Sequence, residues 1–450
     1  MTMKTPIINT KTTGDVFVKI VIIGAGHGGL QAAKELSKDG FDVTVYEKNS
    51  PEKVSYDWRD DVEPTVFEEL KIVLPDNSRK TGRTSFVAPF SETPLYMENE
   101  ENAVEWSIKR NSFVLLLVKL AEEAGAKIKF NTPVQSLIIE NNEVKGVVVE
   151  NEKIFSDLVI DSSGIDSCFR KEVAKIFNIT EELDDNDVFT VYRAIVKTAD
   201  GEKLPENHKK KVYLKYLGMP GISWCICEPD GLINILIGRV GEMAESEFKN
   251  ALTKLKKSNP VIGDEIVMGG KFGRIPVRYP LTKMVGKGYV TVGDAAFMTI
   301  PLTGSGISNS LRAGQILAEE IIKNNSVSVE VLWKYQVRYY EKIGAEHFFV
   351  DYIKRTLLTS DNEDIKYIFE SGIITENDLC NFSSGNGLKF TPQEFVLKLQ
   401  KCLKKSGFVI TILSALMKGI KAKNQAMKIP HNYDEEKIKL WQMKVESLFN

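Results

Sequence analysis

Cysteine is scarce in this sequence, and long apolar runs are absent. The 450 residues contain five scattered cysteines and no CxxC pair, which argues against a disulfide framework or a structural zinc site and favours a reducing, cytoplasmic location. The longest apolar stretches, 113–118 and 408–417, are much shorter than the roughly 18 residues that span a bilayer. Residues 1–17 lack the apolar core of a secretory signal, so we expect a frayed tail there.

An excess of one charge sign is also missing. Lys and Arg number 59 against 61 Asp and Glu, which leaves a net charge of -2 and no general attraction to nucleic acid. The four histidines show no metal-ligand spacing, so no metal is predicted, and His27 is expected at the surface of a turn. Because 43% of the residues are hydrophobic, most of the chain can bury a core.

A buried strand, a glycine turn, a helix and a second strand open the regular part of the chain. Residues 18–23 form a β-branched run typical of a parallel sheet, apolar residues then recur at helical spacing, and 42–47 (DVTVYE) is the second strand. This order predicts a βαβ unit. Residues 51–105 contain five prolines and are predicted to form a lid or excursion outside the sheet core.

Four strand signals lie close together between Val188 and Val240, with no helical pattern between them. They predict an antiparallel sheet in a second domain. A helix at 243–255, a buried strand at 288–292 and a helix at 306–322 are expected to follow, and the remaining periodicity is almost entirely helical.

The first glycine turn, GAGHGG at 24–29, matches GxGxxG in the right place between a strand and a helix. The first glycine permits the tight turn, the second lets a pyrophosphate approach the backbone, and the third lets helix and strand pack closely. Amides at the helix N-terminus then face the phosphates. Glu47 ends the next strand, where a carboxylate binds ribose hydroxyls.

A second glycine turn follows the strand at 288–292. Asp294 ends that strand, where an acid can bind a cofactor hydroxyl, and the helix after 301–307 (PLTGSGI) can stabilise negative charge on a reduced flavin ring. Arg110 precedes a predicted helix and can pair with a phosphate, and 161–164 (DSSG) ends a buried strand in a turn that permits close approach of a ligand.

These segments together resemble the flavoproteins of the p-hydroxybenzoate hydroxylase fold, and among them the geranylgeranyl reductase family. The likeness extends from residue 18 to about 325 and is carried by VIIGAGHGGLQAAKEL with YE, IKRNSF, DLVIDSSG, GYVTVGDAA and PLTGSGISNSLRAGQ. It implies an α/β (α+β overall) fold: a Rossmann-like FAD-binding domain with a parallel sheet, an inserted antiparallel-sheet substrate domain and a helical C-terminal region. The expected segments are 18–60, 106–175 and 280–325 for the FAD-binding domain, 61–105 and 176–279 for the substrate domain, and 326–450 for the helical cap.

The resemblance also implies FAD as the cofactor and a set of residues around it. The first motif and Glu47 would hold the ADP part, Asp294 the ribityl chain, and the PLTGSGI turn would lie against the isoalloxazine ring. The residues expected to bind FAD are Gly24, Ala25, Gly26, Gly28, Gly29, Glu47, Lys48, Arg110, Val134, Asp161, Ser163, Gly164, Gly293, Asp294, Pro301, Gly304, Ser305, Gly306 and Ile307.

The sequence departs from the reductase family in two places. GISWCICEP at 221–229 keeps Trp224 of the family's aromatic substrate-sheet motif, but isoleucines replace two aromatics. The family's Pro-Cys-Gly segment is missing, and KVSYDWRDDVEP at 53–64 stands in its region. Trp224 is a candidate substrate-pocket residue and Tyr56 a candidate proton donor. The 56–60 cluster is either a solvated loop or a cover over flavin or substrate, and both interpretations stay open.

The resemblance implies that reduced flavin saturates carbon–carbon double bonds of an apolar, isoprenoid or lipid-like substrate. An external donor such as NAD(P)H, ferredoxin or another reductant would supply the electrons. A flavin-dependent monooxygenase or halogenase of a small aromatic or apolar substrate shares this fold and is an alternative, as is a non-enzymatic flavin-binding protein.

Two further features each have two interpretations. Cys225 and Cys227 point to one face of a strand, where they are a redox pair or, as we favour, small buried hydrophobes. The segment 398–423 carries seven lysines and no acid around apolar residues. Such a segment can lie peripherally on an anionic membrane, but we favour a cap helix with a solvated lysine face.

Overall fold

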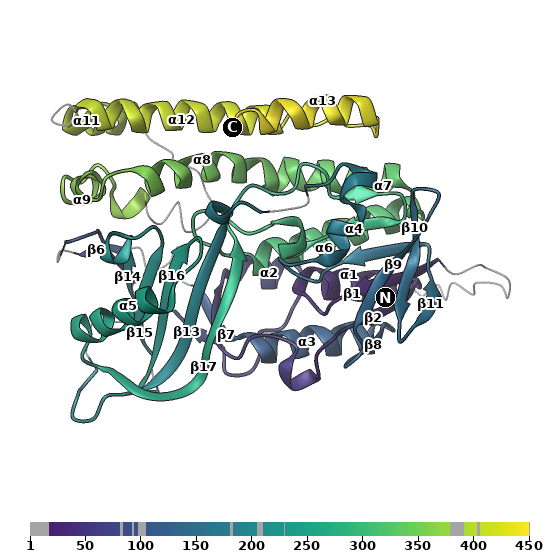
Figure 1. The fold of residues 1–450 in the computed structure, drawn as a ribbon, viewed down its shortest axis with the longest axis horizontal. Helices are drawn as coiled ribbons and strands as arrows, with labels where there is room; N and C mark the ends of the chain where they lie inside the picture. Colours follow the sequence, from purple (N-terminus) through teal and green to yellow (C-terminus); the bar gives the residue numbers. More distant parts are fainter. Residues whose placement is uncertain are drawn as a thin grey trace, which may run out of the picture.

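The computed structural model describes residues 18–449 except 82–83, 92–93, 98–104, 181–182, 205–209, 229, 379–390 and 403–405. The expected tail at 1–17 and residues Pro229, Cys380, Lys404 and Lys405 lie outside the described residues. The fold class is α/β (α+β overall), as predicted. A parallel sheet and a mostly antiparallel sheet lie beside each other, and a layer of helices covers both (Figure 1).

A six-stranded sheet forms the centre of the nucleotide-binding half, in the order β18-β19-β12-β1-β2-β8. Neighbours pair in parallel except β18 and β19 at one edge. The β-branched strand β1 is buried because its neighbours lie on both sides and helices cover the sheet. The predicted βαβ unit is confirmed. The strands are β1 (Lys19–Ile23), β2 (Asp42–Tyr46), β8 (Lys127–Lys129), β12 (Leu158–Asp161), β18 (Val285–Gly286) and β19 (Tyr289–Thr291).

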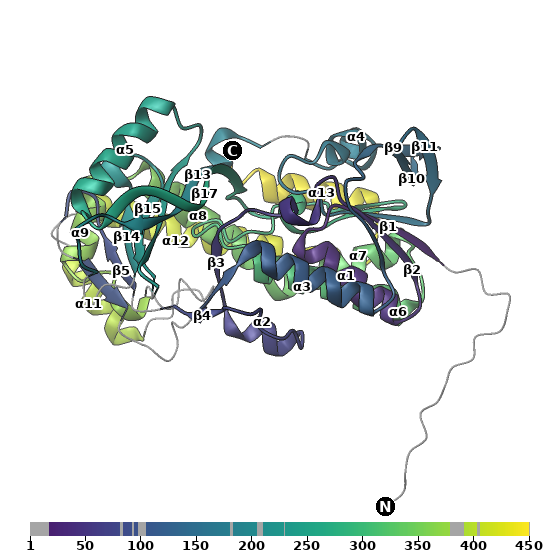
Figure 2. The same cartoon turned by 90° about the horizontal axis from the view of Figure 1, so that it is seen from below.

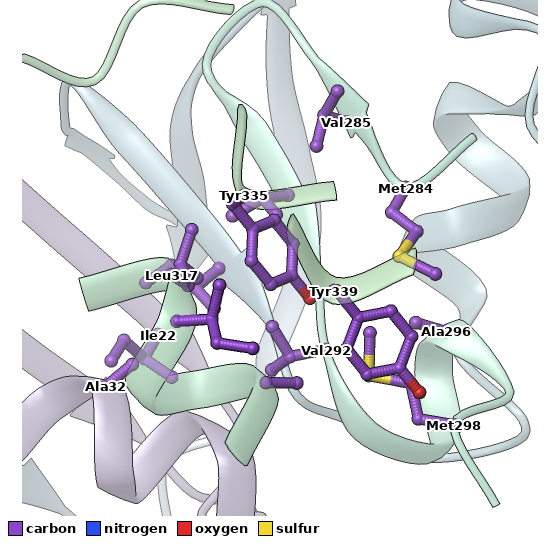
Figure 3. Packing of buried hydrophobic residues seen from close by; sticks show 14 of the residues in the cluster. Ile22, Ala32, Met284, Val285, Val292, Ala296, Met298, Leu317, Tyr335 and Tyr339 are labelled. Atoms are coloured by element: carbon purple, nitrogen blue, oxygen red, sulfur yellow. The ribbon is translucent and has the colours of Figure 1, made fainter. Parts of the chain in front are cut away.

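Helices pack on this sheet and share one hydrophobic core with it. In the core, Tyr335 and Tyr339 lie near Val292, Met298 and Leu317 (Figure 3). The Tyr335 hydroxyl donates to the carbonyl of Thr291, 3.4 Å away, which ties a helix to the sheet. The helices of this half are α1 (His27–Lys38), α2 (Pro64–Glu69), α3 (Arg110–Glu123), α4 (Cys168–Phe177), α6 (Ile307–Asn324) and α7 (Val329–Tyr339).

Two small sheets flank this half. The first has the order β11-β10-β9, and the second has the order β3-β7-β4 and lies toward the large antiparallel sheet (Figure 2). The 56–60 segment therefore leads into a strand. The strands are β9 (Val134–Glu140), β10 (Glu143–Val149), β11 (Glu152–Phe155), β3 (Arg59–Val62), β4 (Arg79–Lys80) and β7 (Trp106–Lys109).

The second large sheet has seven strands in the order β17-β13-β16-β15-β14-β5-β6. The four predicted strands pair antiparallel, as expected. The expectation of irregular structure throughout 51–105 is wrong, because β5 and β6 extend this sheet at one edge. The strand β17 is not predicted by the sequence analysis, because its glycines interrupt the alternation of apolar and polar residues. The bounds are β5 (Thr84–Val87), β6 (Pro94–Met97), β13 (Val188–Thr198), β14 (Lys210–Leu214), β15 (Ile222–Cys227), β16 (Leu232–Val240) and β17 (Ile262–Pro276).

Helix α5 (Glu245–Ser258) covers one face of the seven-stranded sheet, and the C-terminal helices lie over both halves. Helices α11, α12 and α13 form the outermost layer, above α8 and α9 (Figure 1). No helix of the described residues is long and apolar enough to cross a membrane. The bounds are α8 (Ala345–Thr359), α9 (Asn362–Glu370), α11 (Pro392–Cys402), α12 (Ser406–Ala426) and α13 (Glu435–Glu446), with a π-helical turn at Tyr340–Gly344.

Candidate active site

The turn between β1 and α1 packs so closely on Ser162 that side chains do not fit. A Cβ on Gly26 would lie 2.4 Å from the Ser162 hydroxyl oxygen, and one on Gly29 would lie 2.7 Å from its Cβ. Gly24 has a φ of 85°, which glycine adopts without strain. Helix α1 has no side-chain cap at Gly26. Its Gly29 amide donates to the Ser162 hydroxyl at 3.2 Å, which leaves the amides of His27 and Gly28 in the first turn for a ligand. The turn therefore offers backbone donors to a phosphate.

Glu47 holds this turn from the end of β2. It is buried, and its Oε2 accepts the Ala25 amide at 2.9 Å while Oε1 accepts the Asn49 amide at 2.8 Å. Each carboxylate oxygen can accept another bond, so a ribose hydroxyl can still donate to it. Lys48 beside it is exposed, and Val134 begins β9 half-buried.

The second turn brings an acid to the N-terminus of α6. Gly306 starts this helix without a capping side chain, and a Cβ placed on it would lie 3.4 Å from Asp294 Oδ1. Burial raises the pKa of Asp294, Arg110 opposes that shift, and Asp60 adds to it. Because Arg110 and Asp60 both act on the Asp294 carboxyl, the three charged groups belong to one site.

Arg110 and Asp60 form the charged centre of that site. Arg110 begins α3, and its Nη1 donates to Asp60 Oδ2 at 3.2 Å while its Nε donates to the Ser55 hydroxyl at 3.2 Å. Asp60 also accepts from Arg193 of β13. Burial alone would raise the pKa of Asp60, but Arg193 and Arg110 outweigh it and hold the pKa below its ordinary value. The carboxylate therefore stays ionised between two guanidinium groups.

His27 is not the surface residue that we expected. Its side chain is buried against Phe113, with ring centroids 5.7 Å apart, because α1 and α3 pack together. Burial and the charge of Arg110 lower its pKa to about 3, against a smaller opposing effect of Asp60. The imidazole is neutral, and its Nε2 has no hydrogen-bond partner among the described residues.

Aromatic rings and a guanidinium group form a continuous stack from the 56–60 segment to the seven-stranded sheet. Tyr56 and Trp58 stack with centroids 4.0 Å apart and an angle of 7°. The guanidinium of Arg193 lies 5.2 Å from the Trp58 ring and 4.9 Å from the Trp224 ring. Trp58 is 4% exposed, so this part of the segment is not a solvated loop.

The residues at this site fit FAD. Backbone amides at two helix N-termini are available, a carboxylate stands at each turn, with Glu47 buried and Asp294 half-buried, and the buried Nε2 of His27 has no partner among the described residues. These are groups that a pyrophosphate and a polyhydroxyl chain can satisfy.

Comparisons with known proteins agree with this geometry. Residues 17–217 match a family model described as an FAD binding domain. A digeranylgeranylglycerophospholipid reductase from Sulfolobus acidocaldarius is 24% identical over 425 residues, which cover 89% of this chain and 91% of the relative. The chain contains an FAD-binding domain, and over most of its length it is similar to digeranylgeranylglycerophospholipid reductases.

Solved structures share the fold of this chain. A geranylgeranyl bacteriochlorophyll reductase-like protein from Thermoplasma acidophilum superposes with a TM-score of 0.72 at 22% identity, covering 89% of this chain and 99% of the other. A flavin-dependent brominase gives a TM-score of 0.60 at 15% identity, with 87% and 100% covered. Reduction and halogenation thus occur on related folds.

Asp161, whose part in cofactor binding stays a prediction, ends β12 with its side chain bonded within the protein. It is fully buried, and its oxygens accept from Ser163, Ser167 and the Tyr289 hydroxyl. Because both oxygens are engaged within the protein, the side chain shapes the 161–164 turn. Gly164, with a φ of 94°, has open space where a Cβ would stand.

The face of the seven-stranded sheet that carries Trp224 is mostly apolar and reaches the second glycine turn. Phe189, Val191, Leu236 and Val277 form a buried cluster there. A Cβ on Gly304 would lie 3.5 Å from Ile275 Cγ2 and 3.8 Å from Phe189 Cδ1. On the opposite face, Ile235 and Cys225 pack under α5. Ile235 therefore lies on the face opposite Trp224, and Cys225 is buried among apolar residues, as the interpretation of a packing residue requires.

Arg193 is the site residue that the sequence analysis missed. It is 6% exposed in the middle of β13, and besides Asp60 it also donates to the Arg59 carbonyl oxygen. A charged residue inside the apolar run VFTVYRAIV was the available signal, because a buried charge needs a partner. Trp224, which was predicted, lies half-buried against it and donates from Nε1 to Asn234 Oδ1 at 3.3 Å.

Proposed function

We propose that the protein uses reduced FAD to saturate carbon–carbon double bonds of an apolar, isoprenoid or lipid-like substrate. The observation that carries this proposal is the close approach of the apolar sheet face to Gly304 of the second turn, where an added Cβ would touch Ile275. An apolar chain lying along Phe189 and Ile275 would be held beside the turn without an unpaired polar group. The name of the reductase from Sulfolobus acidocaldarius supports the same substrate class.

The chain's own groups would bind and orient the cofactor. The amides of α1 and Glu47 would hold the ADP part, and Asp294 and Arg110 the middle of the molecule. The N-terminus of α6, where backbone amides point out of the helix, would stabilise negative charge beside Gly306. When bound and reduced, FAD supplies the hydride. The electrons would come from an external donor such as NAD(P)H or ferredoxin. The cytoplasmic location of the protein stays a prediction.

Tyr56 is our proposed proton donor for the second carbon. It is 36% exposed, its ring lies 5.4 Å from the Arg110 guanidinium, and its hydroxyl faces Gly273 of β17. Tyr56→Phe keeps the stack on Trp58 and removes only the hydroxyl. We expect turnover to fall about 100-fold, as for the loss of a general acid, with unchanged FAD content. Unchanged turnover would assign the proton to water.

The direction of chemistry is tested without oxygen. Chemically reduced enzyme mixed anaerobically with a polyprenyl alkene should reoxidise and yield a product with one double bond fewer. Reoxidation that requires oxygen, with an oxygen atom incorporated into the product, would instead assign a monooxygenase. Reoxidation that requires oxygen and halide, with a halogenated product, would assign a halogenase. A protein that binds FAD and turns over none of these substrates would contradict the proposal.

A further inference from the structure

One side of α12 exposes a row of large apolar residues. Ile410, Met417 and Ile420 of α12 are 68%, 67% and 51% exposed, and Met427, directly after the end of the helix, is 42% exposed. Their spacing of seven, three and seven residues places them on one side of a helix. Isolated exposed apolar residues are ordinary, but a row along the length of a helix marks a contact surface.

The row continues on the neighbouring helices. Leu440 and Met443 of α13 are 56% and 59% exposed, and Leu397 of α11 is 59% exposed. Helices α11, α12 and α13 lie in one outermost layer that runs along the molecule (Figure 1), and this layer is at the back when the molecule is turned (Figure 2). We call these seven residues the outer row. No described segment of the chain covers it.

The charge of this segment has one sign. Residues 395–433 contain eight lysines and no Asp, Glu or Arg, in a chain whose net charge is -2. Lys418, Lys421 and Lys428 each follow a member of the outer row, are exposed, and form no ion pair within the described residues. By contrast, Lys423 is half-buried and pairs with Glu346 of α8. The part of the outer row on α12 is thus bordered by unpaired positive charge, whereas α13 carries the exposed acid Glu436 four residues before Leu440.

The opposite side of α12 packs toward the second glycine turn. Ala415 and Leu416 join a cluster with Phe349 and Val350 of α8, against which Ile300 and Leu302 also pack. A Cβ on Gly419 would lie 2.8 Å from Phe349 Cδ2, so the two helices are in close contact. Helix α12 therefore covers the elements next to the turn on one side and exposes apolar side chains on the other. The interpretation of this segment as a cap helix accounts only for the side of α12 that packs on α8.

We propose that the outer row and its lysines dock on the surface of an anionic lipid bilayer. The apolar side chains would enter the boundary between headgroups and acyl chains, and the lysines would meet phosphates. A second copy of this chain is a poorer partner for α12, because twofold pairing of that helix would set lysines against lysines, with no acid on the helix. Docking would place the apolar sheet face and the second turn close to a membrane.

The proposal is tested by sedimentation of the FAD-loaded protein with vesicles, without substrate, so that its outcome does not depend on the proposed reaction. Vesicles of phosphatidylcholine alone are compared with equal parts of phosphatidylcholine and phosphatidylglycerol. We expect binding to the anionic vesicles, weakened by salt. Changing Lys418, Lys421 and Lys428 to Gln should weaken binding on the order of 100-fold, at about fivefold per lysine. Met417→Ser with Ile420→Ser should weaken it about tenfold or more.

Matched controls use exposed residues elsewhere. Ile266→Ser on β17, where the isoleucine is 50% exposed, and Lys254→Gln with Lys257→Gln on α5 should leave binding unchanged. All variants should retain FAD absorbance, which separates lost docking from lost folding. Absence of binding to anionic vesicles, or equal loss in the controls, would overturn the proposal. Concentration-dependent dimerisation that Met417→Ser with Ile420→Ser abolishes would assign the face to a second copy instead.

Discussion

Arg193 lies with its guanidinium 4.9 Å from the ring of Trp224, although both belong to a sheet that the cofactor-binding motifs do not include. The same guanidinium reaches Asp60, whose other partner is Arg110 at the start of α3. Trp58 covers the other side of the guanidinium at 5.2 Å. One side chain therefore joins the candidate substrate surface to the charged centre of the cofactor site.

Replacing Arg193 with Met should destabilise the protein. The substitution keeps much of the apolar stem but leaves the buried Asp60 carboxylate with Arg110 as its remaining guanidinium partner. Breaking a buried charged pair in this way costs about 3 kcal/mol or more. Urea unfolding followed by fluorescence measures the change. Arg193→Lys should recover only part of the loss, because an ammonium group lacks the planar fork that meets Asp60 and stacks between two tryptophans.

Lys197→Met on the same strand is the matched control. Its side chain is 58% exposed and pairs with Glu265 at the surface, so the free energy of unfolding should change by about 1 kcal/mol or less. Equal destabilisation by Lys197→Met and Arg193→Met would contradict the role given to Arg193.

Gly26→Ala should weaken FAD retention. The added Cβ would stand 2.4 Å from the Ser162 hydroxyl oxygen, so the turn has to shift away from the geometry that presents its amides. Overpacking of this kind costs about 1–3 kcal/mol, and 1.4 kcal/mol corresponds to about tenfold in affinity. Flavin absorbance per mole of purified protein, with titration of added FAD, gives the measurement. The Gly407→Ala variant, whose added Cβ would meet nothing within 4 Å, should keep the FAD content of the parent protein.

The two glycine turns could be predicted from sequence because their requirements are local. A glycine that must accept a φ of 85° or a helix that must start uncapped is specified within a few residues. Glu47 is similarly fixed, since it ends the strand that follows the first helix. The fold class followed from the order of such units.

The rest of the site depends on contacts between distant segments. Arg193 and Asp60 are 133 residues apart, and no periodicity shows that they meet. Burial of His27 requires α3 to pack on α1, which the turn itself does not reveal. The strand β17 runs over 15 residues with four glycines, so its pairing with β13 rather than its own alternation defines it. These are tertiary effects that override local preference.

Cys225 and Cys227 should be dispensable for turnover. Their mutual hydrogen bond and then burial raise the pKa of the Cys225 thiol, which makes it a poor nucleophile. Cys225→Ser should cost about 1–3 kcal/mol in unfolding free energy, because a hydroxyl replaces a thiol in the α5 core. Exposed Cys168→Ser should cost nothing measurable. Loss of turnover in the double Cys225→Ser, Cys227→Ser variant, with FAD retained, would favour a redox pair.

His27 should make the stability of the FAD-free protein depend on pH. Its pKa is about 3 in the folded chain against an ordinary value of 6.5, so the unfolded chain binds a proton that the folded chain refuses across this interval. The stabilisation is complete above pH 6.5 and is lost as the pH falls toward 3, with a slope of about 1.4 kcal/mol per pH unit for one proton.

His27→Gln should remove that slope from the free energy of unfolding, measured in urea at successive pH values. Buried His347, with a pKa of about 4, contributes a similar slope over a narrower interval, so His347→Gln serves as a positive comparison. His431 is 77% exposed, and His431→Gln should leave the curve unchanged. Carboxylates titrate equally in all of these proteins, so differences between variant and parent isolate the histidines. A His27→Gln curve parallel to that of the parent would mean that the imidazole is hydrated or paired in solution.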